Sequence, residues 1–381
     1  MSLRVVVVDD SAAFGRVIKQ ALELIPGVEV TKLCRSGQAA LDYLQGDVPD
    51  MMTLDIEMPD MNGLEVLHAM REQSIKLPVI VISAASEHAR DLTLRALELG
   101  ALDFVQKPEG SSGEESLAVL RERLAHLTAA ASHRKQVQAI LRGGSNGQAS
   151  PAKVSPPPPR VAAPAVSMTP RDPAALTDTA SRMNRLATRA KPAMVLIGVS
   201  TGGPEALARL IPKLPASLTV PVLIVQHMPP LFTQSLAQKL DSCSSLRVKE
   251  AEEGEIARAG YVYIAPGGSH LKIGAGSQRD IVMQITGDPP ENNCRPAVDY
   301  LFRSAAVAFP GRSVAVILTG MGRDGTLGLR LLRASGCRSI AQDEASCTIF
   351  GMPKEAINAG VVDIVAPLDS IASEIVRAVS S

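Results

Sequence analysis

The sequence predicts an α/β protein with two mainly parallel β-sheets, of which the first is doubly wound. Short runs of β-branched and other apolar residues alternate with segments of helical periodicity in both halves of the chain. Many of these runs end in a polar side chain or a glycine-rich turn, where the carboxyl ends of parallel strands form binding crevices. At 381 residues, the chain is long enough for two domains of ordinary size and a connector.

The first domain is predicted over residues 1–110. Four apolar runs are expected to form its strands. They lie at Arg4–Val8, Met51–Leu54, Val79–Ile82 and Phe104–Gln106. Helical periodicity is found at Phe14–Ile25, Ala39–Leu44, Gly63–Gln73 and Ala89–Leu99. This alternation of strands and helices predicts a doubly wound parallel sheet.

Polar side chains with related chemistry follow the strands of this first sheet. Asp9 and Asp10 follow the first run, and Asp55 closes the second. Such carboxylates are hard ligands for Mg²⁺, which keeps waters and phosphate oxygens in its coordination shell. One carboxylate is then free to be phosphorylated, while Lys107 would neutralise the phosphoryl charge and Ser83 would donate a hydroxyl hydrogen bond. Any single carboxylate could instead be a helix cap or a loop charge, but this does not explain all of them at strand ends.

These residues, with the segment Leu54–Pro59 and the pair Lys107-Pro108, resemble the receiver domain of response regulators. The resemblance implies a flavodoxin-like fold and makes Asp55 the phosphoacceptor. It also implies that the backbone carbonyl of Glu57 completes the metal site. Phe104, three residues before Lys107, matches the aromatic residue that switches in this family.

A connector is predicted over residues 111–190. Glu114–Leu141 has the pattern of a helix, after which the composition shifts to glycine and then to the four prolines 156–159. Residues 131–192 hold ten Lys or Arg against two Asp. A basic, proline-containing segment without aromatic residues favours a solvated flexible tether over a binding segment.

The second domain is predicted over residues 191–381, and its first strand runs into a hydroxyl residue among glycines. The apolar run Val195–Val199 leads to Ser200, followed by Thr201 and the glycines 202 and 203. Small neighbours let the backbone turn sharply, so Ser200 would stand at the end of a strand near the positive end of the next helix. From this turn alone, a nucleophile mount and a phosphate cradle are both compatible with the pattern.

A serine nucleophile needs a base and a third group that orients the base. His227 follows the apolar run Val222–Gln226, and Asp324 follows Val314–Leu318 and a glycine-rich turn. Three strands therefore end in Ser, His and Asp. His227 is the preferred base, and His270 is expected to be a rim residue. Taken singly, His227 could close its strand by a backbone hydrogen bond, and Asp324 could cap the next helix.

Three short strands are expected between residues 261 and 285, at Tyr261–Ala265, His270–Ile273 and Ile281–Ile285. They are too close together for crossover helices. We expect an antiparallel hairpin there, at one edge of a mainly parallel sheet. The chain order Ser, His, Asp differs from the order of α/β-hydrolases, so the sequence predicts another serine hydrolase architecture.

Five segments of the second half resemble the catalytic domain of the chemotaxis protein-glutamate methylesterase family, CheB. They are Gly198–Gly203, Gln226–Pro229, Tyr263–Gly267, Leu318–Gly325 and Glu344–Pro353. They occur in the family's order over about residues 191–381. The resemblance implies that Ser200 is the nucleophile, His227 the general base and Asp324 its orienting carboxylate. It also implies an oxyanion hole at the backbone N–H near Met321.

The two resemblances together imply an enzyme of chemotactic adaptation that hydrolyses glutamate methyl esters on chemoreceptors and releases methanol. The acyl-enzyme would form on Ser200, and the same chemistry permits deamidation of glutamines. Phosphorylation of Asp55 by the chemotaxis histidine kinase would activate the esterase, which needs no cofactor of its own. Residue patterns alone give only a phosphorylation-controlled serine hydrolase. The alternative is a response regulator whose second domain is a non-catalytic binding module.

Composition excludes several other classes. Lys and Arg total 39, Asp and Glu also total 39, and only 3% of residues are aromatic, so no nucleic-acid-binding surface is expected. The five cysteines are scattered without a C-x-x-C pair, which favours a reduced cytoplasmic protein. Because no apolar run approaches about 18 residues, neither membrane insertion nor a signal peptide is expected.

Overall fold

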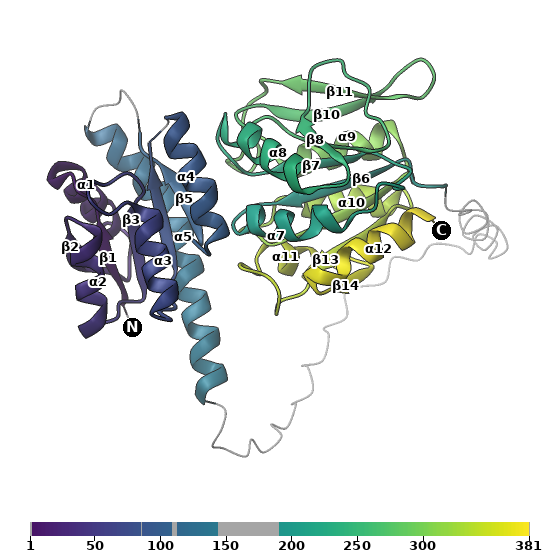
Figure 1. Cartoon of the computed structure of the whole chain (residues 1–381). Coiled ribbons are helices and arrows are strands. Elements are labelled where there is room, and N and C mark those ends of the chain that lie inside the picture. Colours follow the sequence, from purple (N-terminus) through teal and green to yellow (C-terminus); the bar gives the residue numbers. More distant parts are fainter. Residues whose placement is uncertain (1, 85, 109–112, 144–189, 381) are drawn as a thin grey trace, which may run out of the picture.

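The computed structural model describes residues 2–84, 86–108, 113–143 and 190–380. Their strands form a five-stranded sheet, a seven-stranded sheet and a separate two-stranded sheet (Figure 1). Most of the segment predicted to be a tether lies outside the described residues. In the described part of the chain, no helix is both long and apolar enough to cross a bilayer.

The first sheet is parallel and has the order β2-β1-β3-β4-β5. Its strands are β1 (Leu3–Val8), β2 (Val28–Cys34), β3 (Met51–Asp55), β4 (Val79–Ser83) and β5 (Asp103–Gln106). Its helices are α1 (Ala12–Glu23), α2 (Gly37–Gly46), α3 (Gly63–Glu72), α4 (Glu87–Glu98) and α5 (Gly113–Gly143). The predicted doubly wound sheet is confirmed, and the strand order reverses between β1 and β3, where a ligand crevice is expected.

Strand β2 was not predicted, for a physical reason. It lies at the edge of the sheet, and its residues are mostly half-buried or exposed. Polar residues therefore interrupt its apolar residues, and it lacks the continuous apolar run of the buried strands.

Capping side chains fix where the first four helices begin. Ser11, Ser36 and Ser86 each accept a hydrogen bond from a backbone N–H in the first turn of α1, α2 and α4. At α3, Asn62 and Glu65 form a reciprocal capping box. These caps hold the helices against the carboxyl ends of the strands that precede them.

The second sheet is also parallel, with the order β14-β13-β12-β6-β7-β9-β8. Its strands are β6 (Met194–Val199), β7 (Val222–Gln226), β8 (Arg247–Glu250), β9 (Tyr261–Ile264), β12 (Ser313–Ile317), β13 (Arg338–Gln342) and β14 (Ile364–Ala366). Its helices are α7 (Gly203–Leu210), the short 3₁₀ helix η1 (Ile211–Lys213), α8 (Phe232–Cys243), α9 (Val298–Ala308), α10 (Thr326–Ala334), α11 (Met352–Asn358) and α12 (Leu368–Ser380). Chain order reverses at β6, between β12 and β7.

Successive side chains of β6 enter two different cores. Val195 and Ile197 pack in the core that includes α7, α8 and α12, whereas Met194 and Leu196 pack in the core that includes α9, α10 and α11. Every residue of β6, β7 and β12 is buried. Burial on both faces explains why these strands are uninterrupted apolar runs in the sequence.

The expected antiparallel hairpin is present, but its place differs from the prediction. Strands β10 (His270–Ala275) and β11 (Ile281–Thr286) pair with each other in a sheet of their own, not at an edge of the main sheet. Strand β9 instead lies inside the main sheet, parallel to both β7 and β8. The prediction failed there because β8 and β9 are joined by a non-helical crossover over residues 251–260, a connection without a periodic signal.

The two large sheets are brought together by helix α4. This helix packs against both α7 and α8, so the first sheet faces the second through it (Figure 1). Glu98 of α4 forms an exposed ion pair with Lys239 of α8, at 3.1 Å.

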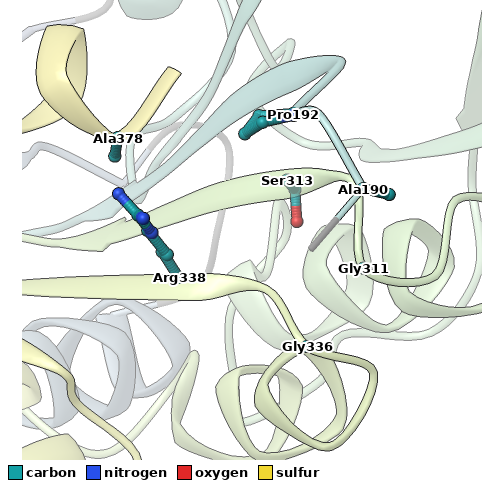
Figure 2. A pocket seen from close by; sticks show the side chains of 7 residues that line it. All are labelled: Ala190, Pro192, Gly311, Ser313, Gly336, Arg338 and Ala378. Carbon is teal, nitrogen blue, oxygen red and sulfur yellow. The ribbon is translucent and has the colours of Figure 1, made fainter. Parts of the chain in front are cut away.

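A small hollow lies at the amino ends of β6, β12 and β13 (Figure 2). It is lined by small residues, among them Pro192 and Gly311, and by Arg338. This is the edge opposite to the carboxyl ends of the strands, so the hollow is remote from the crevice where these folds carry their chemistry.

Candidate active site and phosphorylation site

Three predicted residues meet at the carboxyl edge of the second sheet. Ser200 directly follows β6, His227 directly follows β7, and Asp324 lies in the turn between β12 and α10. Strands β12, β6 and β7 are neighbours in the sheet, so the three turns converge where the strand order reverses.

The ring nitrogens of His227 join the other two residues. Nε2 lies 2.8 Å from Asp324 Oδ2, and Nδ1 lies 3.1 Å from Ser200 Oγ. Because an ionised carboxylate can only accept, Nε2 carries a proton and donates it to Asp324. Nδ1 is then the nitrogen that accepts from the Ser200 hydroxyl, as a general base for a nucleophile must.

Asp324 is buried and is held by the first turn of α9. Its carboxylate accepts hydrogen bonds from the backbone N–H groups of Val298 at 2.6 Å and Asp299 at 3.0 Å. Helix α9 has no side-chain cap of its own, so this carboxylate satisfies N–H groups at the positive end of the helix. Asp324 therefore caps α9, and it also accepts from Gly325 N–H at the start of α10.

The surroundings of His227 favour its protonated form. Burial lowers the pKa of His227, but the hydrogen bonds to Asp324 and Cys294 outweigh burial and raise it above the usual value. Cys294 Sγ lies 3.5 Å from Nδ1. Burial raises the pKa of Asp324, but the hydrogen bond from His227 is among the interactions that lower it by more. The net pKa is below the usual value, so this carboxylate stays ionised. The site thus stabilises the imidazolium that forms when His227 takes a proton.

Glycines permit the sharp turn that presents Ser200. Gly202 has a left-handed φ of 75°, and a Cβ at Gly203 would lie 1.9 Å from Gln226 Oε1. Gln226 in turn donates from Nε2 to the Ser200 carbonyl at 3.0 Å. The end of β7 approaches this turn so closely that a side chain at Gly203 would clash with Gln226. This explains why the predicted motif has glycine there.

Met321 lies in the turn after β12, next to the serine. A Cβ at the preceding Gly320 would lie 2.8 Å from Ser200 Cβ, so the two turns are in contact. Gly320 N–H donates to Ile349 O, whereas the N–H of Met321 has no acceptor within the described residues. The backbone N–H of Met321 is thus free to serve a substrate beside Ser200.

The prediction for His270 is wrong. Its side chain is completely buried at the start of β10 rather than exposed at the rim of the crevice. Nδ1 accepts from Ala297 N–H at 3.2 Å, and Nε2 lies 3.1 Å from Pro289 O. Both nitrogens are therefore occupied by backbone groups, and His270 has none left for a base.

Three residues near the triad were missed in the sequence. Asn292 donates to Asp324, Cys294 contacts His227, and the buried Asp299 shares Asn292 with Asp324. The loop before α9 carries no periodic pattern. Its only signal is the pair Asn292-Asn293, which is a common turn dipeptide.

The first sheet carries the predicted acidic cluster. Oxygens of Asp9, Asp10 and Asp55 lie within 4.8 Å of one another, and Asp9 and Asp55 are buried. Lys107 Nζ lies 2.6 Å from Asp55 Oδ2 and 3.6 Å from Asp9 Oδ2. The lysine thus partly balances three carboxylates.

The cluster fits a hard divalent cation. Asp9 Oδ2 is buried and accepts no hydrogen bond from the described residues, with Lys107 Nζ as an ion-pair partner at 3.6 Å. Burial raises the pKa of Asp9 to about 6, and the charge of Asp55 adds to this, although Lys107 opposes it. A site with excess negative charge and a buried carboxylate oxygen that accepts no hydrogen bond from the described residues matches the ligand preference of Mg²⁺. Glu57 lies beside this acidic cluster, and the backbone N–H of Glu57 donates to Asp55 Oδ1 at 3.3 Å.

Ser83 is placed at the end of β4 but faces α4. Its buried hydroxyl accepts from Thr93 Oγ1 at 2.7 Å and lies 3.1 Å from Ala84 O. In this conformation the hydroxyl is engaged with α4, and its bond to a phosphoryl group stays a prediction.

Phe104 joins the two halves of the molecule. Its ring stacks on Phe232 at 4.4 Å between centroids, with 29° between the planes. Phe232 begins α8, directly after the loop of His227. The neighbouring Asp103 lies near Thr201 and His227, and burial raises its pKa. The first domain therefore contacts the second close to the turns that carry Ser200 and His227.

Comparisons with known proteins agree with this architecture. The family model described as CheB methylesterase matches residues 195–375, and the response regulator receiver domain model matches residues 5–116. A Desulfotalea psychrophila protein named protein-glutamate methylesterase/protein-glutamine glutaminase is 43% identical over 379 residues, which are 99% of each chain. The chain belongs to the CheB methylesterase family. A relative with the same name from Halalkalibacterium halodurans is 40% identical over 98% of each chain.

The crystal structure of the Thermotoga maritima CheB methylesterase catalytic domain is also similar. It is 45% identical, covers 49% of this chain and 99% of that chain, and aligns with a TM-score of 0.48. The matches to both family models and to the full-length relatives confirm the family and the fold class that the motifs predicted. It also favours a catalytic output over the non-catalytic binding module.

Proposed function

We propose that this CheB protein is a phosphorylation-activated serine hydrolase that removes methyl groups from glutamate esters of chemoreceptors and deamidates receptor glutamines. One observation carries the proposal: a continuous hydrogen-bond chain from Ser200 through His227 to Asp324 at the switch point of the second sheet. The relatives bear the name of this esterase and glutaminase over almost the whole length.

Acyl transfer uses the three residues in sequence. Ser200 Oγ attacks the ester carbonyl while His227 Nδ1 takes its proton, and Asp324 stabilises the imidazolium. The oxyanion accepts from the backbone N–H of Met321. His227 then protonates the leaving oxygen, and methanol departs. Water, activated by His227, releases glutamate from Ser200; a glutamine substrate loses ammonia in the first step instead.

The receiver takes its phosphoryl group on Asp55 from the histidine kinase of the chemotaxis system. Asp9, Asp10, Asp55 and the Glu57 carbonyl would hold Mg²⁺, which supplies positive charge to the transferred group. Lys107 adds a second positive charge beside Asp55. Ser83 donates its hydroxyl to the phosphoryl group after turning from α4.

The same contacts account for regulation. In the unphosphorylated chain, Phe104 stacks on Phe232 and Asp103 lies near Thr201, so the receiver would restrict access to the catalytic residues. A phosphoryl group on Asp55 competes for Lys107 and Ser83 and changes the face that bears Phe104. The covered population then decreases and the esterase gains access to receptors.

We assign the receiver to residues 1–110, the connector to 111–190 and the catalytic domain to 191–381. We place the protein in the cytoplasm, because its five cysteines are all free thiols. It would work there without nucleic acid and without inserting into the membrane.

Methanol release from methylated receptor membranes tests the proposal. We expect release by the full chain, an increase on adding Mg²⁺ and a small acyl phosphate, and none with Ser200→Ala. A fluorophosphonate probe separates the esterase from a binding module, because only an assembled triad makes Ser200 reactive. Unlabelled Ser200 and undetectable methanol would favour the binding module.

A further inference from the structure

The turn that precedes α9 has a backbone suited to asparagine. Glu291 and Cys294 close it with reciprocal backbone hydrogen bonds of 3.1 and 2.9 Å. Asn292 and Asn293 between them have φ angles of 54° and 60°. Two successive left-handed residues form the tight turn in which Asn is tolerated better than most side chains. The backbone alone therefore explains why asparagine stands at both positions.

The two asparagines differ in what their side chains do. Asn292 Nδ2 donates to Asp324 Oδ1 at 3.0 Å and to Asp299 Oδ2 at 3.2 Å. An amide nitrogen carries two hydrogens, so Asn292 gives one to each carboxylate. Both asparagines are exposed, and within the described part of the chain the side chain of Asn293 makes no hydrogen bond.

The bridge joins two buried acids. Asp324 and Asp299 are 3% and 1% exposed, and no basic side chain contacts Asp299 among the described residues. Burial raises the pKa of Asp299 to about 6; the hydrogen bond from Gly328 N–H opposes this and the charge of Asp324 adds to it. Two such groups can share one region only if donors are placed between them. Asn292 places a neutral donor there.

The turn is held from behind. His270 accepts from Ala297 N–H and donates to Pro289 O, so one buried ring bridges both ends of the loop. The ring also stacks on Tyr300 at 4.3 Å between centroids. The same turn reaches the base, because Cys294 Sγ lies 3.5 Å from His227 Nδ1. Asn292 is therefore fixed relative to both members of the His227–Asp324 pair.

We propose that Asn292 is a positioning residue of the esterase, whose amide joins Asp324 to a second buried carboxylate, Asp299, and thereby fixes Asp324 against His227. This inference rests on the proposed roles of Ser200, His227 and Asp324. It extends the catalytic machinery from three residues to a network in which Asp299 is the outer acid.

Glycine substitutions at the two asparagines isolate the bridge. Glycine accepts a left-handed backbone without strain, so Asn292→Gly and Asn293→Gly both keep the turn. Each removes an amide, but only Asn292→Gly removes the one that bridges Asp324 and Asp299. The full chain is assayed by methanol release from methylated receptor membranes with Mg²⁺ and an acyl phosphate. We expect Asn292→Gly to lower kcat by about tenfold or more with KM within about twofold, since a hydrogen bond to a charged group is lost. Asn293→Gly should match the wild type.

The dependence on pH separates positioning from a merely structural role. Asn292→Asp keeps the shape but replaces the donor with a third carboxylate, which favours the imidazolium of His227. We expect the acidic limb of kcat/KM to move to higher pH in Asn292→Asp and to stay in place in Asn293→Gly. Equal kcat values and superimposable pH profiles for the Asn292 and Asn293 variants would overturn the proposal. So would a loss in Asn292→Gly that merely follows a lower melting temperature, with an unshifted profile in Asn292→Asp. Should Ser200→Ala itself retain activity, the triad assignment fails instead.

Discussion

The two ring nitrogens of His227 contact different partners, and this determines which nitrogen can accept the proton of Ser200. Nε2–H is committed to a buried carboxylate, so only Nδ1 can take the proton of Ser200. Asp324 is held in turn by the backbone N–H groups of Val298 and Asp299. The amino terminus of α9 therefore holds Asp324 in place, and Asp324 determines which ring nitrogen of His227 carries the proton.

Removing single members of the triad should abolish the esterase without unfolding it. We expect Ser200→Ala and His227→Ala each to lower kcat by about 10⁴-fold or more, because triad members act as a unit. Asp324→Asn should cost less than Ser200→Ala. Methanol release measures kcat, and circular dichroism checks the fold. Activity of His227→Ala within about tenfold of the wild type would require another base.

The pH profile should reflect the raised pKa of His227. The base must be neutral to accept the proton, so kcat/KM rises as pH increases through that pKa. Burial lowers the pKa but the bonds to Asp324 and Cys294 raise it more, so the midpoint should lie above the 6.5 of free imidazole. Asp324→Asn removes the carboxylate and should move the midpoint to lower pH. The labelling rate of Ser200 by a fluorophosphonate, followed over pH, measures it; a midpoint unchanged by Asp324→Asn would contradict this assignment.

Phosphorylation should depend on Asp55 and on its acidic neighbours. Asp55→Asn should block phosphoryl uptake from an acyl phosphate in Mg²⁺, because the acceptor oxygen is lost. Asp10→Asn should raise the Mg²⁺ concentration needed for uptake, because one charged ligand is removed. Radiolabelled phosphate, labile in acid and base, measures both effects. Wild-type stoichiometry in Asp55→Asn would identify another acceptor.

Motif reasoning placed the chemistry at the strand ends but missed what lies behind it. The carboxyl ends of parallel strands meet at one edge, so Ser200, His227 and Asp324 could be brought together from apolar runs alone. Asn292 and Asp299 could not, since their contacts depend on a left-handed turn and on the approach of α9. His270 was misjudged because the glycines before it suggested a surface loop, whereas it begins a buried strand.

At the scale of elements, the turn between β6 and α7 is tightly constrained. It must bend sharply and also pass close to the segment after β13. A Cβ at Gly202 would lie 2.4 Å from Thr348 Cβ. Strands that are continuous apolar runs, such as β6, β7 and β12, were predicted from the sequence. Strand β2 and the helix-free connection between β8 and β9 were not, because neither has a distinctive periodic pattern.

Alanine at Gly202 should therefore destabilise the catalytic domain more than left-handed strain alone. Gly254 is a matched control, since its φ of 73° is close to the 75° of Gly202 but nothing lies within 4 Å of its Cβ position. We expect Gly254→Ala to lower the free energy of unfolding by about 1–2 kcal/mol. Gly202→Ala should cost about 1–3 kcal/mol more, because of the clash with Thr348. Urea unfolding of the two variants measures the difference, and equal midpoints would show that the turn relaxes freely.

At the scale of the whole molecule, two independently built sheets share one functional surface. The catalytic sheet has a hydrophobic core made entirely from its own residues, on the side of α9, α10 and α11. The receiver contacts the catalytic domain through the stacked rings of Phe104 and Phe232. The sequence could not predict this contact, because neither Phe104 nor Phe232 stands in a pattern that identifies its partner.

Weakening this contact should activate the resting enzyme. We expect Phe104→Ala to raise methanol release without phosphodonor, and the fragment 191–381 to be more active than the resting full chain and indifferent to phosphodonor. Loss of about 1.4 kcal/mol of closure is enough for a tenfold change.

Lys239→Ala serves as the control for Phe104→Ala. It removes the exposed ion pair with Glu98 across the same interface, and such pairs contribute little. Its basal activity should stay near that of the wild type. A fragment slower than the resting full chain would show that the receiver helps to build the site.

Two short stretches of backbone lead from Lys107, beside the proposed phosphoacceptor, and from His227, the proposed base, to one pair of stacked rings. Phe104 lies three residues before Lys107, and Phe232 lies five residues after His227. The stacked rings close the gap between these stretches, so the signal need not travel through the connector sequence. Over evolutionary time, insertions and deletions in the connector should be neutral for the switch. A single residue inserted within 104–107 or 227–232 would turn one ring away from the other. Phosphorylation of the receiver should then no longer change the activity of the esterase.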